Sequence, residues 1–225
     1  MAICTVRKLS QLGTNLVLAP ERYDPRRVVT LTDESESVVR MSEIVKTVRL
    51  TVSPAAASPG SYLILDTSHA RDGIVISDRG LVTSDEIGSA KKTIEPGDVI
   101  ISRLRPYLRQ VAFVDSEIRF YGSKTTILCS TEFFVIRSAD MESIAFLVPF
   151  LLSQNVQQVL AAAQEGGHHP RFDELTLLGL PVPPVLIQNR KEISQRVKES
   201  VALFRRSERE MLTLIRSAES IATTV

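Results

Sequence analysis

The residues with the clearest chemical potential lie in one cationic segment at 103–109. It reads Arg-Leu-Arg-Pro-Tyr-Leu-Arg, so arginines occur at alternate residues and again four residues later. A guanidinium group can bind a phosphate or the O6 and N7 edge of guanine, and a tyrosine can stack on a base. The segment therefore favours nucleic-acid binding. The alternative is a solvated rim or an internal salt-bridge set with Asp115, Glu117 and Glu132.

Catalytic motifs are not found in the chain. It contains no phosphate-binding loop, no dinucleotide-binding glycine motif and no nucleophile elbow. The pair His168-His169 occupies adjacent positions, which do not point at one metal ion, and Glu95 and Asp98 lack the Glu-x-Lys partner of a metal-dependent nuclease. We predict no catalytic residues and no metal site. A small nuclease or hydrolase that uses these histidines or carboxylates stays as an alternative.

Composition is that of an ordinary globular protein. The 225 residues carry 27 Lys and Arg against 26 Asp and Glu, a net charge of +1, with 44% hydrophobic residues. Any positive field must therefore be local. Cys4 and Cys129 are far apart and outside any CxxC motif, which excludes a disulfide framework and a structural zinc site.

Targeting and membrane signals are weak. The first residues carry charge only after their apolar part, unlike a secretory signal. The most apolar stretch, 144–152, is interrupted by Pro149 and is too short to span a bilayer. We expect a cytoplasmic protein with no membrane partner.

The cationic segment lies within a region of short β-branched runs. Each run has four or five residues and is bordered by Gly, Pro, Asp or Ser, which predicts strands. A Pro-Gly-Asp turn at 96–98 leads directly into one of them. The expected strands cover residues 62–66, 73–77, 99–102, 111–114, 125–129 and 132–136.

Helical spacing appears before and after these runs. Residues 41–49 place apolar side chains on one face and predict a short helix. Residues 141–154, 155–164 and 173–178 predict further helices, the first of them kinked at Pro149. The prolines of 180–184 predict an extended segment.

From Gln188 to Ala222 the chain contains neither Gly nor Pro, which predicts one helix roughly 52 Å long. Apolar residues follow a spacing of four and three along it, with a charged fault at Glu208, as in a coiled coil. Such a helix requires a partner helix, or else it packs back on its own domain. The predicted seam consists of Val197, Val201, Phe204, Met211, Ile215, Ala218 and Ala222.

Several segments together resemble one recognition half of a type I restriction–modification specificity subunit. The resemblance covers the chain from about Glu21 onward, and a Pro-Gly-Asp strand, a Ser-Thr-Glu-Phe strand and a Leu-Pro-x-Pro exit make it fairly specific. The start of the long helix departs from the family's Gln-x-x-Ile spacing by two residues. The matching segments are ERYDP (21–25), VVRMSEIV (38–45), IEPGDVIISRLRPYLRQVAFV (94–114), STEFFVIRS (130–138), FLVPFLLSQNVQQVL (146–160) and GGHHPRFDELTLLGLPVPPVLIQNRKEISQRV (166–197).

The resemblance implies a fold and a domain division. We expect an α/β (α+β) protein with a small mixed or antiparallel sheet, flanking helices and a long C-terminal coiled-coil helix. Residues 1–20 are an unassigned lead-in, 21–180 a target-recognition domain and 181–225 a spacer and dimerisation helix. A complete family member has two such domains and two helices, so we expect a half-subunit that forms a homodimer or pairs with a separate second half.

The resemblance also implies a function and partners. We expect non-catalytic recognition of one half of a split double-stranded DNA target, with methyltransferase subunits, and a restriction subunit, as protein partners. S-adenosylmethionine would be bound by the methyltransferase subunits, and this chain would bind no cofactor. By analogy with the family's layout, the expected DNA contacts are Arg103, Arg105 and Arg109, then Tyr121 and Lys124.

A second group of expected DNA contacts follows the flexible pair Gly166-Gly167. These residues are His168, His169 and Arg171, and the alternative is an ordinary surface loop. A further alternative for the whole chain is a protein–protein adaptor that acts through its coiled coil.

Overall fold

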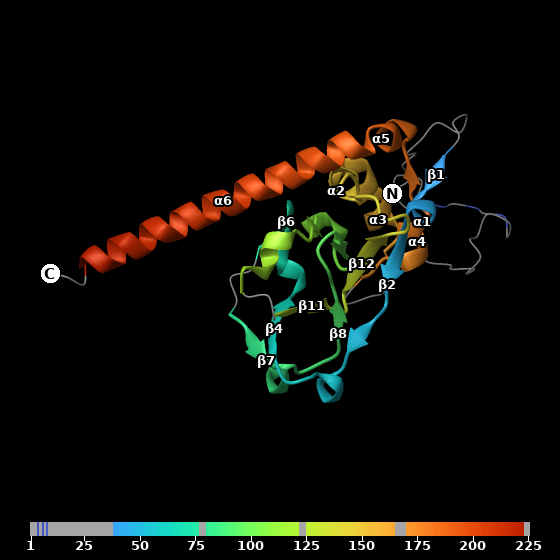
Figure 1. The fold of residues 1–225 in the computed structure, drawn as a ribbon. Coiled ribbons are helices and arrows are strands. Elements are labelled where there is room, and N and C mark those ends of the chain that lie inside the picture. The colour runs from blue at the N-terminus through green and yellow to red at the C-terminus, as the bar shows by residue number, and fades with distance from the viewer. Residues whose placement is uncertain are drawn as a thin grey trace.

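The computed structural model describes residues 4, 6, 8, 38–76, 80–121, 125–164 and 170–222, without the side chains of 119–121 and 221–222. Its centre is a mixed sheet in the order β2-β12-β9-β10-β6-β5, in which only β10 and β6 run parallel (Figure 1). The strands are β2 (Val45–Val48), β12 (Phe133–Ser138), β9 (Val99–Ser102), β10 (Val111–Phe113), β6 (Gly73–Val75) and β5 (Ala70–Arg71).

A second mixed sheet has the order β3-β8-β11-β4-β7, with β11 and β4 parallel. Its strands are β3 (Thr51–Val52), β8 (Lys91–Thr93), β11 (Thr126–Ser130), β4 (Ser61–Leu65) and β7 (Val82–Thr83). A two-stranded ladder joins β1 (Val39–Arg40) to β13 (Pro181–Val182). The expected mixed α/β class is confirmed, with two large sheets instead of one small sheet.

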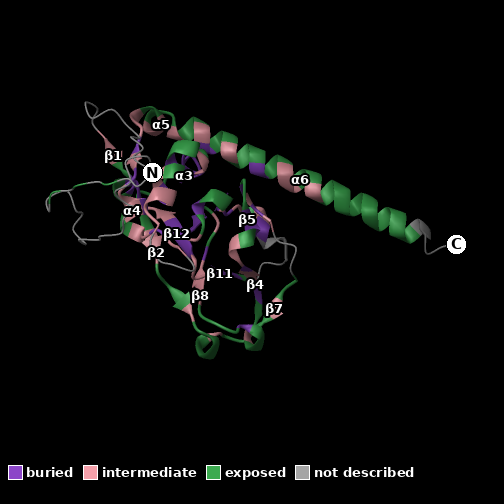
Figure 2. Cartoon of the chain, turned by 180° about the vertical axis from the view of Figure 1, so that it is seen from behind, coloured by how far each residue is buried: buried purple, intermediate pink, exposed green. Residues whose placement is uncertain are grey.

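Side chains that alternate between the two faces of the central sheet form two hydrophobic cores, one on each face. Successive strand residues point to opposite faces, so Ile100, Ala112 and Val135 pack with residues of the second sheet, including Leu63 and Ile127. The opposite face packs against helices and carries Val99, Ile101, Val111, Phe113, Phe134 and Ile136. Figure 2 shows the buried residues concentrated in this body of the molecule.

Short helices cover the outer face of the central sheet. They are α1 (Met41–Ile44), α2 (Leu147–Leu152), α3 (Gln154–Ala162), α4 (Glu174–Leu178) and α5 (Pro184–Gln188). Gly73 allows α2 to approach β6: its φ is +89°, and a Cβ there would lie 2.9 Å from Cγ1 of Val148. Single-turn 3-10 segments occur at Pro54–Ala56 (η4), Thr67–His69 (η5), Ser84–Glu86 (η6) and Pro106–Leu108 (η7), and a longer one at Ser116–Tyr121 (η8).

The predicted helix at 41–49 is wrong in its second half. The helix ends at Ile44, and Val45–Val48 continues as β2 in antiparallel pairing with Val135–Ser138. The β-branched residues of this segment favour a strand once a partner strand is available.

The long helix α6 (Arg190–Ala222) has 33 residues, or about 50 Å, and projects past the body of the domain (Figure 1). It starts two residues later than predicted, because the separate helix α5 ends at Gln188 and Asn189 is its C-cap. Its first half packs on the domain, where Ser194 and Val201 are buried. Beyond Arg209 its described residues are exposed (Figure 2). The alternative in which the long helix packs back on its own domain is therefore correct for its first half only.

Candidate nucleic-acid interface

The cationic segment forms the connection between β9 and β10. The Ser102 N–H donates to the carbonyl of Gln110 at 2.9 Å and closes the base of this loop. The 3-10 turn η7 forms the tip, and the backbones of Arg105 and Arg109 on either side are left-handed, with φ of +44° and +52°. Such angles are uncommon for residues with a Cβ and persist where surrounding contacts impose them.

Local contacts hold the tip in this shape. Pro106, whose ring presets φ, begins the turn and is buried. The Leu108 N–H donates to the Arg105 carbonyl at 2.9 Å, and the Arg109 N–H donates to the Pro106 carbonyl at 2.7 Å. The Arg109 guanidinium reaches across to donate to the Leu152 carbonyl at the end of α2. These hydrogen bonds hold the loop against the helical layer.

Glu132 connects this loop to a second basic segment. Its Oε2 accepts from Nε of Arg103 at 2.8 Å and Nε of Arg171 at 3.0 Å, and its Oε1 accepts from Nη2 of Arg171 at 2.7 Å. The hydrogen bonds from Arg171 and then Arg103 lower the pKa of Glu132 from 4.5 to about 2, although burial opposes the shift. The carboxylate thus stays ionised and holds two arginines side by side.

The three predicted arginines of the loop are in different environments. Arg103 is ion-paired with Glu132, as the salt-bridge alternative expected. Arg109 is exposed and bonded to a neutral carbonyl, so its charge is not compensated by that contact. Arg105 is exposed and has no carboxylate partner in the described part of the chain. Two of the three guanidinium groups therefore have no carboxylate partner among the described residues.

Arg171 was predicted from a separate segment, and the tertiary structure brings it to the loop. Leu104 and Arg171 form an isolated antiparallel bridge, and the Phe172 N–H donates to the Arg103 carbonyl at 3.3 Å. In the sequence, Glu132 is only one of the first three acidic residues that follow the cationic segment. No local signal marks its position between Arg103 and Arg171. The predicted contacts Lys124, His168, His169 and the side chain of Tyr121 lie outside the described residues, as do residues 21–25 of the family resemblance.

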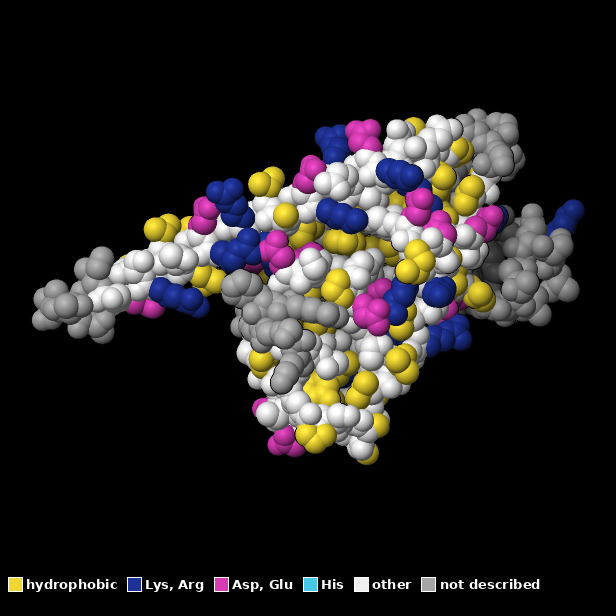
Figure 3. Space-filling view, in the orientation of Figure 1, with side chains coloured by type: hydrophobic (Ala, Val, Ile, Leu, Met, Phe, Trp, Pro, Cys, Tyr) yellow, Lys and Arg dark blue, Asp and Glu magenta, His cyan; other side chains and the backbone are white. Residues whose placement is uncertain are grey.

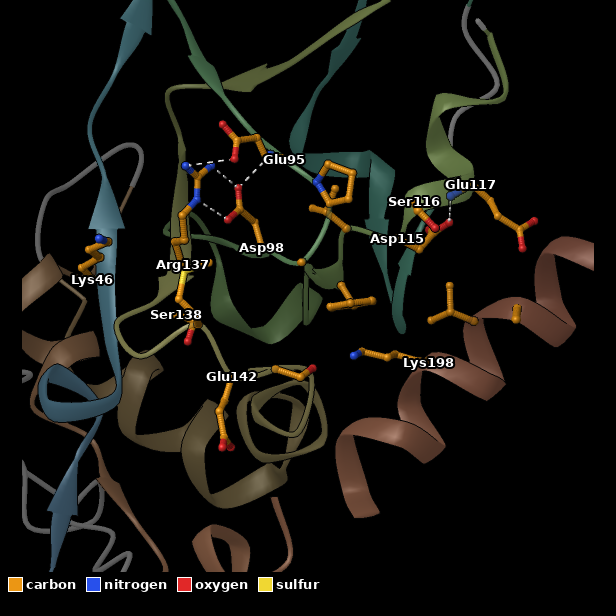
Figure 4. Close-up of a pocket in the computed structure, with 18 residues that line it drawn as sticks. Lys46, Glu95, Asp98, Asp115, Ser116, Glu117, Arg137, Ser138, Glu142 and Lys198 are labelled. Atoms are coloured by element: carbon orange, nitrogen blue, oxygen red, sulfur yellow. Dashed lines mark hydrogen bonds and ion pairs between the residues drawn. The ribbon is translucent and has the colours of Figure 1, made fainter. Parts of the chain in front are cut away.

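A cavity of about 840 Å³ lies between the central sheet and α6 (Figure 4). Its wall contains Asp98, one of the carboxylates of the enzyme alternative. Asp98 is 1% exposed and accepts two hydrogen bonds from Arg137, at 2.7 and 2.8 Å, and one from the Glu95 N–H. Its oxygens hold the Pro-Gly-Asp turn against β12, which is a structural role.

Other carboxylates around this cavity also form ion pairs with arginines. Asp115 pairs with Arg205, Glu117 with Arg209, and Glu142 with Arg190. Within the described ranges, no three His, Cys, Asp or Glu side chains form a group that could hold a metal ion. No helix in that same part of the chain is long and apolar enough to cross a membrane.

The predicted apolar seam of α6 is buried where the helix packs on the domain and exposed where the helix projects beyond it. Val201 is 3% exposed and Val197 is partly buried, both in the core that contains α2. The assignment of Val201 to an intermolecular seam is therefore corrected: the domain of the same chain covers it. Met211 and Ile215 are 58% and 47% exposed, and Ala218 is exposed as well. Figure 3 shows apolar side chains on the surface of the projecting half of the helix, between charged ones.

These features define a class of protein: a two-sheet α/β domain that presents an arginine-rich loop and extends into a projecting helix. Comparison with solved structures identifies the fold more closely. It is that of specificity subunits of type I restriction–modification systems, as the sequence resemblance predicted.

Two solved chains carry this comparison. One comes from a structural study of complex assembly and conformational transition of the type I R-M system, with a TM-score of 0.53. The other is the HsdS subunit from Thermoanaerobacter tengcongensis, with a TM-score of 0.51. Each is 24% identical and covers 81% of this chain and 48% of its own, so this chain spans about half the length of either. No protein-family model and no curated protein sequence matches the chain.

Proposed function

We propose that the chain is a DNA-recognition unit of a type I restriction–modification system, which reads one half of a bipartite target. The observation that carries the proposal is the fold shared with these solved chains over 81% of this chain. The chain performs no catalytic step itself. It supplies a position on the DNA to partner subunits that do the chemistry.

The arginine-rich loop supports the DNA part of the proposal. Arg105 and Arg109 are exposed at the tip, and Arg103 and Arg171 stand behind them around a single carboxylate. Exposed guanidinium groups suit phosphate contacts and bidentate readout of guanine. With a net charge of only +1 for the whole chain, this local cluster is the favoured DNA face.

The projecting half of α6 supports a protein partner. Met211, Ile215 and Ala218 continue the spacing of four and three and are exposed, which in an isolated chain leaves apolar surface in water. We propose that this stripe pairs with the helix of a second copy or of a separately encoded second half. Two-fold pairing would place two recognition domains at a defined separation on DNA.

Methyltransferase subunits are the proposed protein partners of the assembled pair, and a restriction subunit is a further one. S-adenosylmethionine would reside on the methyltransferase subunits. The cytoplasm, where DNA is modified, is the expected compartment.

The test uses the full chain in two measurements. The first is the mass in solution by light scattering after size exclusion, for which we expect twice the chain mass. The second is binding to random duplex DNA over a salt series. We expect binding that weakens steeply as salt rises, because phosphate contacts release counterions, and sequence preference that sharpens when methyltransferase subunits are added.

The alternatives give different results. An adaptor would form the dimer and bind no duplex even at low salt. A nuclease or hydrolase would cut DNA or turn over substrate as a purified chain, and that turnover would overturn the proposal.

A further inference from the structure

Two large side chains at the tip of the arginine-rich loop are directed to solvent. Tyr107 is 66% exposed and Leu108 is 48% exposed, while their neighbour Pro106 is buried. The proline anchors the turn in the domain, and the next two residues project from it. The tip therefore presents an aromatic and an aliphatic group together on a single 3-10 turn.

The turn is built to hold these two residues out. Arg105 and Arg109 keep left-handed backbones on either side of it, a conformation that costs free energy for residues with a Cβ. Two backbone hydrogen bonds hold that conformation, from the Leu108 N–H to the Arg105 carbonyl and from the Arg109 N–H to the Pro106 carbonyl. A third bond joins the Arg109 guanidinium to the Leu152 carbonyl. Rigid presentation of apolar side chains avoids an ordering cost when they bind.

Positive charge lies on both sides of the apolar tip. Arg105 precedes it and has no carboxylate partner among the described residues, and Arg109 follows it and contacts a neutral carbonyl. In duplex DNA each base step lies between phosphates, and the faces of the bases are apolar. An apolar wedge between two cations therefore complements a base step that has been partly opened.

We propose that Tyr107 and Leu108 enter between two base pairs of the bound duplex, with Arg105 and Arg109 on the flanking phosphates. The inference rests on the proposed DNA recognition and deepens it, because it adds a source of specificity without hydrogen-bonded base readout. Steps that unstack easily, such as TA and CA, are favoured at the wedge because their deformation costs less.

The experiment uses the full chain and a duplex selected for binding from a random pool, with 2-aminopurine placed at each position in turn. This base analogue becomes brighter when it is unstacked. We expect a rise in fluorescence at one step with the wild-type chain. Tyr107→Ala should remove the rise and weaken binding by about 10-fold, whereas Tyr107→Phe should keep both.

Two further variants distinguish the effect of the wedge from the effect of the neighbouring positive charge and from the loss of any exposed apolar side chain. Arg105→Gln should weaken binding and lower its salt dependence, but leave the rise in fluorescence. Leu50→Ala removes another exposed leucine, 67% exposed in the connection between β2 and β3, and should change neither quantity.

The wedge is overturned if the wild-type chain binds duplex without a rise in 2-aminopurine fluorescence at any position and Tyr107→Ala keeps the wild-type affinity. In that case the proposed DNA recognition would still stand. It is also overturned if Tyr107→Ala leaves DNA affinity intact but abolishes co-migration with methyltransferase subunits, since the tip would be a protein contact. Failure of the wild-type chain to bind any duplex at low salt would overturn the proposed function and the wedge together.

Discussion

Arg205 of α6 and Asp115, which follows β10, form a largely buried ion pair between the long helix and the domain. The Arg205 Nη2 lies 2.9 Å from Oδ2 of Asp115, and the two side chains are 11% and 12% exposed. The same guanidinium donates to the Val75 carbonyl at 2.6 Å and to Glu208 at 2.9 Å. The pair lies one helical turn beyond Val201, the last buried apolar residue among the described side chains of α6, and therefore holds the helix against the domain at that point.

Asp115→Asn should destabilise the protein by about 1–3 kcal/mol, because it leaves a largely buried guanidinium with a weaker set of partners. Asparagine keeps an acceptor oxygen for the Glu117 N–H, which Asp115 binds at 3.0 Å. Urea unfolding followed by circular dichroism measures the change. Glu192→Gln, which breaks an exposed pair with Arg196 on the same helix, is the control and should cost less than about 0.5 kcal/mol. Equal effects of the two variants would contradict the anchoring role.

Arg137→Met should cost about 3–5 kcal/mol, because it leaves the buried Asp98 carboxylate without its cationic partner. The double variant Asp98→Asn with Arg137→Met should recover part of this loss, since it removes the uncompensated charge. Chemical denaturation of both variants checks the prediction. If the single and double variants are equally unstable, Asp98 does not depend on Arg137 for its stability.

The Arg103–Glu132–Arg171 cluster should make stability depend on pH in the acid range. The pKa of Glu132 falls from 4.5 in the unfolded chain to about 2 in the folded protein. Its contribution is therefore fully present above pH 4.5 and is lost as the pH falls towards 2. Glu132→Gln should flatten the dependence in this window, measured as the free energy of unfolding at several pH values. An unchanged slope in the variant would show that the carboxylate is not stabilised by its arginines.

Arg105→Gln should weaken DNA binding on all sequences and lower the slope of log K against log salt by about one, the signature of a lost phosphate contact. Arg105 has no carboxylate partner in the part of the chain that the structure describes, so the fold should be unaffected. Filter binding over a salt series gives both quantities. Arg206→Gln, on the polar side of α6 and 73% exposed, is the matched control and should leave the slope as it is.

Met211→Glu combined with Ile215→Glu should convert the proposed dimer to a monomer, because two charges would enter an apolar helix–helix contact. Both residues are exposed in the single chain, so the circular dichroism spectrum of the domain should persist. Light scattering after size exclusion measures the mass. Ser217→Glu, an exposed residue off the seam, should leave the mass unchanged. Persistence of the dimer in the double variant would place the contact elsewhere.

Local patterning in the chain was sufficient to predict much of the secondary structure. The Pro-Gly-Asp turn and the run after it predicted 99–102, which is the extent of β9, and 173–178 predicted α4 to within one residue. The long helix was predicted for a similar reason, since a segment without Gly or Pro and with apolar residues at helical spacing has few other conformations. In these segments neighbouring residues alone define the favoured backbone.

The remaining features of the fold and the site depend on contacts between residues that are far apart in the sequence. Val45–Val48 is a strand because β12 offers it hydrogen bonds, and nothing within 41–49 shows that partner. Glu132 and Arg171 meet although 39 residues separate them. Val201 and Met211 share one helical pattern, yet the domain buries the first and leaves the second exposed. The spacing of a helix specifies which face is apolar, whereas the surface that covers that face depends on how distant segments pack.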